Sequence, residues 1–270
     1  MHRVLAIATM SFRRLYRTRL LAVALVVAGL VPGAYSTILI VMFTAAKAGK
    51  MHQVESIFPE FFGVMVGLFE MVAAVLGAII GMTLVRRDMN DGTIYSVLSK
   101  PITRGEYVAG NALGGFAMLA VVWMIFALVM ATISGAVGLP LGGTHFAIMG
   151  CRLLLSSVSL AAALMFATRF NPWGAVALTL LLVNGIGIVE TGAKILGLLH
   201  LDVPELLIKV ACFPFPVMNA LNDLTTRVTR SSIQSASILP GLIHIVDYVA
   251  VLLVLGYLFF RRLELNRTSD

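Results

Sequence analysis

Six runs of apolar residues constrain this chain more than any other feature of its sequence. They lie at about residues 20–44, 61–85, 107–137, 147–168, 173–200 and 241–260. A helix that crosses a bilayer needs about 20 apolar residues, and each run reaches that length. The sequence therefore predicts an all-α integral membrane protein with six transmembrane helices, in a single domain over residues 1–270.

The composition excludes two other classes of protein. Hydrophobic residues make up 59% of the chain and charged residues 12%, whereas soluble domains are roughly a quarter charged and disordered chains are poor in apolar residues. The net charge of +7 could indicate a nucleic-acid-binding protein, but the basic residues flank the apolar runs instead of forming one patch. We therefore expect the lipid bilayer as the partner, and no nucleic acid.

The distribution of Lys and Arg predicts the orientation. An even number of spans places both termini on one side, and an excess of Lys and Arg marks the cytosolic side. We therefore expect a multi-pass membrane protein with both termini in the cytosol. The thirteen basic residues on the side of the termini are Arg3, Arg13, Arg14, Arg17, Arg19, Arg86, Arg87, Lys100, Arg104, Arg169, Arg261, Arg262 and Arg267, against five on the other side, Lys47, Lys50, Lys209, Arg227 and Arg230.

Two segments outside the apolar runs are amphipathic. Residues 2–19 mix arginines with apolar residues, a pattern typical of a helix lying in the membrane interface. A signal peptide is the alternative, but the following apolar run is too long for one, so we predict an uncleaved first span. In the outer segment 201–240, Val217, Leu221 and Leu224 recur every three or four residues, which predicts a helix along the outer membrane surface.

The segment 86–104 is the longest polar interruption in the first half of the chain. Asp91 fits the N-cap of a short helix and Pro101 its end. Ile94, Val97 and Leu98 would share one face of that helix. Such a helix between two spans is suited to docking into a partner, although the pattern alone fits a solvated loop with one helical turn equally well.

The residues of this segment resemble a known family. Asp88-x-x-x-Gly92-Thr93, followed by Leu98-Ser99-Lys100-Pro101-Ile102-x-Arg104, resembles the cytosolic coupling segment of type-2 ATP-binding-cassette (ABC) exporter permeases. The chain departs from the family pattern at Asp88, where Glu is usual, and at Gly110-Asn111, where the family has a Gly-Lys pair.

The resemblance implies a mechanism and its partners. The chain would be a permease subunit that pairs with a second permease subunit, as a homodimer, and with separate ABC ATPase subunits that carry ATP and Mg. It also implies that helices in 201–240 dip back into the outer leaflet. The residues that would couple the ATPase to the spans are Asp88, Gly92, Thr93, Ile94, Val97, Leu98, Pro101 and Arg104.

The sequence lacks common motifs of nucleotide binding and metal-dependent catalysis. The sequence has no Gly-x-x-x-x-Gly-Lys-Ser/Thr loop to hold a nucleotide and no His-Glu-x-x-His for zinc. We therefore expect a transport subunit and not an enzyme, with no metal and no cofactor in this chain. Cys151 and Cys212 both fall near the outer side of the predicted topology, where a disulfide or two buried free thiols are the alternatives.

Five ionisable residues lie inside the predicted spans, where a charge costs ~2.5–3.5 kcal/mol even on the insertion scale. They are Glu70, Arg152, Glu190, Lys194 and Asp247. One interpretation is that they line a translocation path. The other is that Glu190 pairs with Lys194 and Arg152 with Asp247 to hold helices together, which leaves Glu70 without an evident partner.

Two functions from other classes compete with the permease. A membrane-embedded lipid-modifying enzyme could use Glu70 or Asp247 as a general base, and a secondary transporter could use Glu70 as a proton site. Activity of the chain alone, without an ATPase, would favour either of them.

Overall fold

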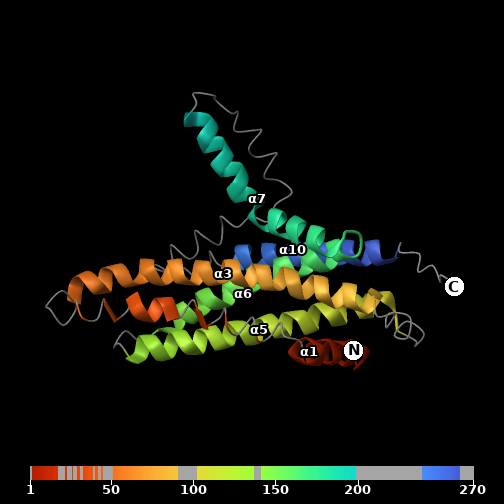
Figure 1. Ribbon diagram of the computed structural model, residues 1–270, viewed down its shortest axis with the longest axis horizontal. Coiled ribbons are helices and arrows are strands. Elements are labelled where there is room, and N and C mark those ends of the chain that lie inside the picture. The colour runs from red at the N-terminus through yellow and green to blue at the C-terminus, as the bar shows by residue number, and fades with distance from the viewer. Residues whose placement is uncertain are drawn as a thin grey trace.

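The computed structural model describes residues 2–17, 22, 26, 29–30, 33–38, 40–41, 44, 51–90, 102–136, 141–198 and 239–261. Every regular element in this part of the chain is a helix: α1 (His2–Arg17), α3 (Met51–Asn90), α5 (Arg104–Ala136), α6 (Gly143–Ala167), α7 (Pro172–Leu198) and α10 (Leu239–Arg261). The side chains described are those outside 51–60, 90, 186–198 and 239–241. Figure 1 shows α3, α5, α6 and α10 running side by side as a bundle.

Within the described residues, four helices are long and apolar enough to cross a membrane: Phe61–Met89, Arg104–Ala136, Gly143–Ala167 and Leu242–Arg261. They coincide with the second, third, fourth and sixth apolar runs. The apolar stretch Pro172–Gly185 of α7 covers the start of the fifth. Most of the first run lies outside the described residues, so the number of six spans stays a prediction. The outer segment 201–240 also lies outside them, except for the start of α10.

Helix α6 is the centre of the bundle, in contact with α3, α5, α7 and α10. Two glycines of α3 let it approach α6 closely. A Cβ added at Gly77 would lie 2.5 Å from Ser159 Oγ, and one added at Gly81 would lie 2.6 Å from the Leu160 carbonyl oxygen. The Gly-x-x-x-Gly spacing, which brings membrane helices together, therefore serves the contact between α3 and α6.

A tight turn joins α6 to α7. The Asn171 side chain accepts a hydrogen bond of 2.6 Å from the Gly174 backbone N–H, and Pro172 is the first residue of α7. Asn is a favoured N-cap and proline a favoured first helical residue. This turn lies at the same end of the bundle as Arg86, whose guanidinium donates to the Phe170 carbonyl oxygen.

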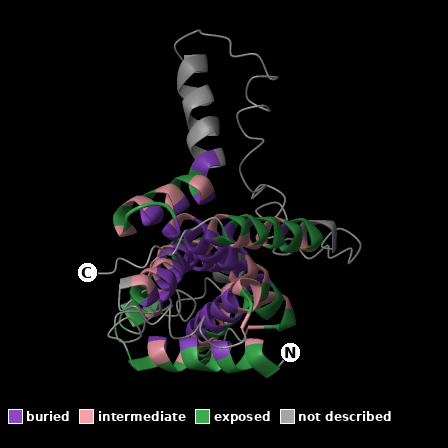
Figure 2. Cartoon of the chain, turned by 90° about the vertical axis from the view of Figure 1, so that its right-hand side faces the viewer, coloured by how far each residue is buried: buried purple, intermediate pink, exposed green. Residues whose placement is uncertain are grey.

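Helix α1 lies across one end of the bundle, as the view along the long axis in Figure 2 shows. Its buried residues Ile7, Ser11 and Leu15 form one face, packed against α5. Its other side is exposed and carries Arg13 and Arg17. This orientation suits the predicted interfacial helix, although the position of the bilayer stays a prediction.

Candidate functional site

The two ends of the polar segment 86–104 are anchored to different helices, and Asp88 anchors the first. Asp88 lies two residues before the end of α3 and is only 4% exposed. Arg14 of α1 donates to its Oδ1, and the Tyr107 hydroxyl of α5 donates to its Oδ2 at 2.5 Å. Removing one partner from a buried charge costs about 3–5 kcal/mol. One carboxylate thus ties three helices together.

Small residues dock α1 onto α5 next to this carboxylate. A Cβ at Gly110 would lie 2.6 Å from Ile7 Cβ, and one at Gly114 would lie 2.8 Å from the Ala8 carbonyl oxygen. The buried Asn111 side chain accepts a hydrogen bond of 2.7 Å from the Ser11 hydroxyl. The Gly110-Asn111 pair, one of the departures from the family pattern, therefore belongs to the contact surface with α1.

Arg104 anchors the other end of the segment. Its guanidinium donates to the carbonyl oxygens of Phe260 at 3.1 Å and Arg261 at 2.7 Å. The last carbonyls of a helix lack intrahelical partners and carry the negative end of its dipole, so Arg104 caps α10. The Tyr107 ring stacks on the Phe260 ring at 5.4 Å, which strengthens the same contact between α5 and α10.

Thr103 and Glu106 fix the start of α5. Glu106 Oε2 accepts from the Thr103 backbone N–H at 2.8 Å and from its hydroxyl at 3.0 Å, and the Thr103 hydroxyl accepts from the Glu106 backbone N–H at 3.2 Å. This reciprocal arrangement is a capping box. The Thr-x-x-Glu spacing of the sequence is the local signal for this capping box, which was not among the predicted features.

The other predicted coupling residues lie outside the described part of the chain. They are Gly92, Thr93, Ile94, Val97, Leu98 and Pro101. The structure thus describes the two ends of the segment, at Asp88 and at Arg104, which we call its stems. The docking face between them stays a prediction.

Within the bundle, Glu70 of α3 and Arg152 of α6 form an ion pair, in which Arg152 Nη1 donates to Glu70 Oε2. Both residues are buried, with exposed fractions of 9% and 8%. The alternative pairing of Arg152 with Asp247 is wrong, because Asp247 is exposed on α10. Glu190 and Lys194 lie four residues apart on α7, with side chains outside the described set.

A cluster of three aromatic side chains is connected to this pair. Phe69, next to Glu70 in the chain, stacks on Phe126 at 3.7 Å and meets Trp123 edge to face at 4.8 Å. The Trp123 indole N–H donates to the Ser156 hydroxyl at 3.0 Å, which in turn donates to the Arg152 carbonyl oxygen at 2.9 Å. These contacts, together with the ion pair, join α3, α5 and α6.

Comparison with protein families agrees with this architecture. The family model of the ABC-2 family transporter protein matches residues 6–265, which is nearly the whole chain. The chain belongs to the ABC-2 transporter family. No curated protein matches it. Membership makes this chain an ABC permease, the membrane component of a transporter. Cys151 of this permease is partly buried on α6, and Cys212 lies outside the described residues.

Proposed function

We propose that this ABC-2 permease is the membrane subunit of an exporter, driven by a separate ATPase that binds segment 86–104. The observation that supports the proposal most is the anchoring of both stems of that segment. Through Asp88, a displacement of the segment would reach α1, α3 and α5. Through Arg104 it would reach α10.

The mechanism follows from these contacts. Closure of the ATPase subunits on ATP would push the segment, and the stems would pass the displacement to the bundle as rigid-body movement. Packed helices transmit such movement because their interfaces adopt discrete arrangements and do not deform continuously. The capping box of Thr103 and Glu106 would keep the start of α5 helical while the segment is displaced.

The proposal includes an orientation and an assembly. Arg14, Arg86 and Arg104 gather at one end of the bundle, and an excess of basic residues marks the cytosolic side. That end would therefore face the cytosol and the ATPase, with both termini inside a prokaryotic inner membrane. A second copy of the permease would complete the exporter as a homodimer.

The ion pair between Glu70 and Arg152 argues against the competing functions that use Glu70. A general base or proton site requires a carboxylate that can exchange protons with its substrate, and the Glu70 carboxylate is buried in an ion pair with Arg152. This favours a structural role for Glu70 over a role as general base of a lipid-modifying enzyme or as proton site of a secondary transporter.

Purification of the native complex tests the proposal. We expect a nucleotide-hydrolysing ABC subunit to copurify with the chain, and substrate transport to require it. Transport by the chain alone, reconstituted without that subunit, would contradict the proposal.

A further inference from the structure

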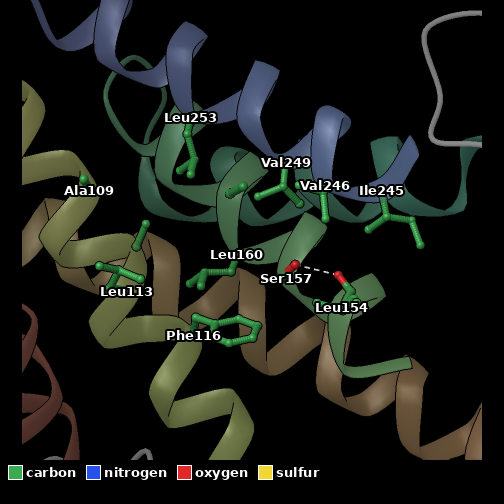
Figure 3. A pocket seen from close by; sticks show the side chains of 12 residues that line it. Ala109, Leu113, Phe116, Leu154, Ser157, Leu160, Ile245, Val246, Val249 and Leu253 are labelled. Carbon is green, nitrogen blue, oxygen red and sulfur yellow. Dashed lines mark hydrogen bonds between the residues drawn. The ribbon is translucent and has the colours of Figure 1, made fainter. Parts of the chain in front are cut away.

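A groove lies between α5 and α10, with α6 as its floor. It has a volume of about 420 Å³, within the range of roughly 300–1,000 Å³ typical of sites for small organic ligands. Figure 3 shows Leu113 and Phe116 on one wall, Val249 and Leu253 on the other, and Leu160 between them. Leu113 is 48% exposed, so the groove opens onto the outside of the bundle.

The lining of the groove is apolar and favours a hydrocarbon ligand. Among the described residues that line the groove, Ser157 carries the one polar side chain, and its hydroxyl donates to the Leu154 carbonyl oxygen at 2.5 Å. The lining therefore favours an apolar ligand over a polar one. An apolar groove beside a bilayer gains dispersion contacts when a hydrocarbon chain fills it.

With Arg104 at the membrane surface, the α5 wall of the groove would lie at the depth of the acyl chains of one leaflet. Along α5 the lining residues run from Ala109 to Phe116. At the rise of a helix these residues are ~8 Å and ~18 Å from Arg104. One leaflet contributes about half of the ~30 Å hydrocarbon core. A lipid with its headgroup near Arg104 could therefore place its chain along the groove.

Basic residues lie at that end of the groove. Leu253, Tyr257 and Arg261 follow each other at spacings of four residues on α10, which places them along one side of the helix. The Tyr257 ring would lie 3.7 Å from a Cβ at Gly105, so α5 and α10 meet just below the groove. Beyond this contact, Arg261 is exposed, and the Arg104 guanidinium donates to its backbone carbonyl oxygen at 2.7 Å.

We propose that the groove binds an acyl chain of an anionic phospholipid from the leaflet on the Arg104 side, with the headgroup phosphate at Arg261 and Arg104. Basic sites between helices on the cytosolic side are suited to anionic headgroups. The apolar groove holds the chain and the arginines select the headgroup. This site would set the separation of α5 and α10, next to Arg104, the residue that anchors segment 86–104 to α10.

Photolabelling in vesicles tests the site. The full chain is reconstituted in phosphatidylcholine vesicles that contain phosphatidylglycerol with a diazirine in its acyl chain. We expect label in the α5 peptide around Leu113 and in the α10 peptide around Val249. The rim variant Leu113→Trp should lower this label about tenfold. Leu128→Trp is the matched control, because Leu128 is 61% exposed on α5 outside the groove, and should leave the label unchanged.

A second arm tests the headgroup. Arg261→Gln removes the exposed guanidinium but keeps the backbone carbonyl that Arg104 caps, so the labelling by the anionic lipid should fall to that by phosphatidylcholine carrying the same diazirine. Equal labelling of the wild-type groove by the two lipids would overturn the headgroup assignment. Label spread over α5 without enrichment around Leu113, or an efficient disulfide between Leu113→Cys residues of two copies, would overturn the lipid site.

Discussion

The Tyr107 hydroxyl donates a hydrogen bond of 2.5 Å to the carboxylate of Asp88, which joins α5 to α3 where the polar segment leaves the bundle. Nineteen residues separate the two along the chain, and that interval contains the whole predicted coupling helix. Arg14 binds the other oxygen of the same carboxylate. The stems of the segment are therefore fixed to each other and to α1, so the segment moves together with the helices that it connects.

Tyr107→Phe removes this hydrogen bond and should weaken the contact between the stems. A hydrogen bond to a charged group contributes about 1.5–3 kcal/mol, and the variant should lose stability by that order. We also expect less substrate transported per ATP hydrolysed, because the segment would move without α5. Denaturant unfolding in detergent and coupled transport assays measure the two effects.

Tyr16→Phe is the matched control for that variant. Tyr16 lies on α1 and is 63% exposed, so its hydroxyl should contribute little to stability or coupling. Equal stability and equal coupling of the two variants would show that the hydrogen bond between Tyr107 and Asp88 contributes to neither.

Gly81→Val should disrupt the packing of α3 on α6. The added Cβ would lie 2.6 Å from the Leu160 carbonyl oxygen and 2.8 Å from Ala163 Cβ, and backbone atoms cannot move aside. Overpacking costs about 1–3 kcal/mol or more, which a lower melting temperature would report. Gly67→Val is the control, because no described atom lies within 4 Å of its added Cβ; a comparable loss there would contradict the assignment of this helix contact.

The ion pair between Glu70 and Arg152 can be tested by removing one or both charges. Glu70→Leu leaves a buried guanidinium without its carboxylate, at a cost of about 3–5 kcal/mol. The double variant Glu70→Leu with Arg152→Leu should regain most of that stability, since replacing both partners of a buried pair is often neutral.

Transport then separates the two interpretations of this pair. We expect the double variant to transport substrate, in agreement with a structural tie between α3 and α6. A double variant that folds and binds its ATPase, but does not transport, would place the pair on the translocation path instead.

Leu98→Asp should abolish coupling without disturbing the bundle. The predicted coupling helix would dock through Ile94, Val97 and Leu98, and a carboxylate at this apolar contact would be buried without a partner. We expect loss of the ATPase from the purified complex, with an unchanged melting temperature of the permease. Lys100→Ala, outside this predicted apolar set, serves as the control; retention of the ATPase by Leu98→Asp would remove Leu98 from the contact.

The partner of Glu70 could not be predicted from the sequence, because it depends on the packing of two helices that are far apart in the chain. Glu70 lies on α3 and Arg152 on α6, 82 residues later. The apolar run predicts a fourth span from residue 147, but α6 begins at Gly143, four residues earlier. Arg152 therefore lies about one helical turn further from the start of its helix than the run indicates.

Other features differ in how far the sequence reveals them. The apolar runs predicted where α5, α6 and α10 begin and end to within four residues, because length and hydropathy alone decide a span. Helix α3 begins at Met51, ten residues before its run. The capping box at Thr103 could have been predicted from the local Thr-x-x-Glu spacing. The role of Gly110 and Asn111 could not be predicted from the sequence, because it depends on where α1 crosses α5, and tertiary packing of that kind leaves no local pattern.

Photo-cross-linking from position 95 in living cells tests whether an ATPase binds segment 86–104. A photoreactive amino acid in place of Tyr95 would lie in the middle of the polar segment, within reach of a cytosolic partner. We expect a covalent adduct with an ABC ATPase subunit. Adducts with lipid or with proteins of the external side, and none with an ATPase, would contradict it.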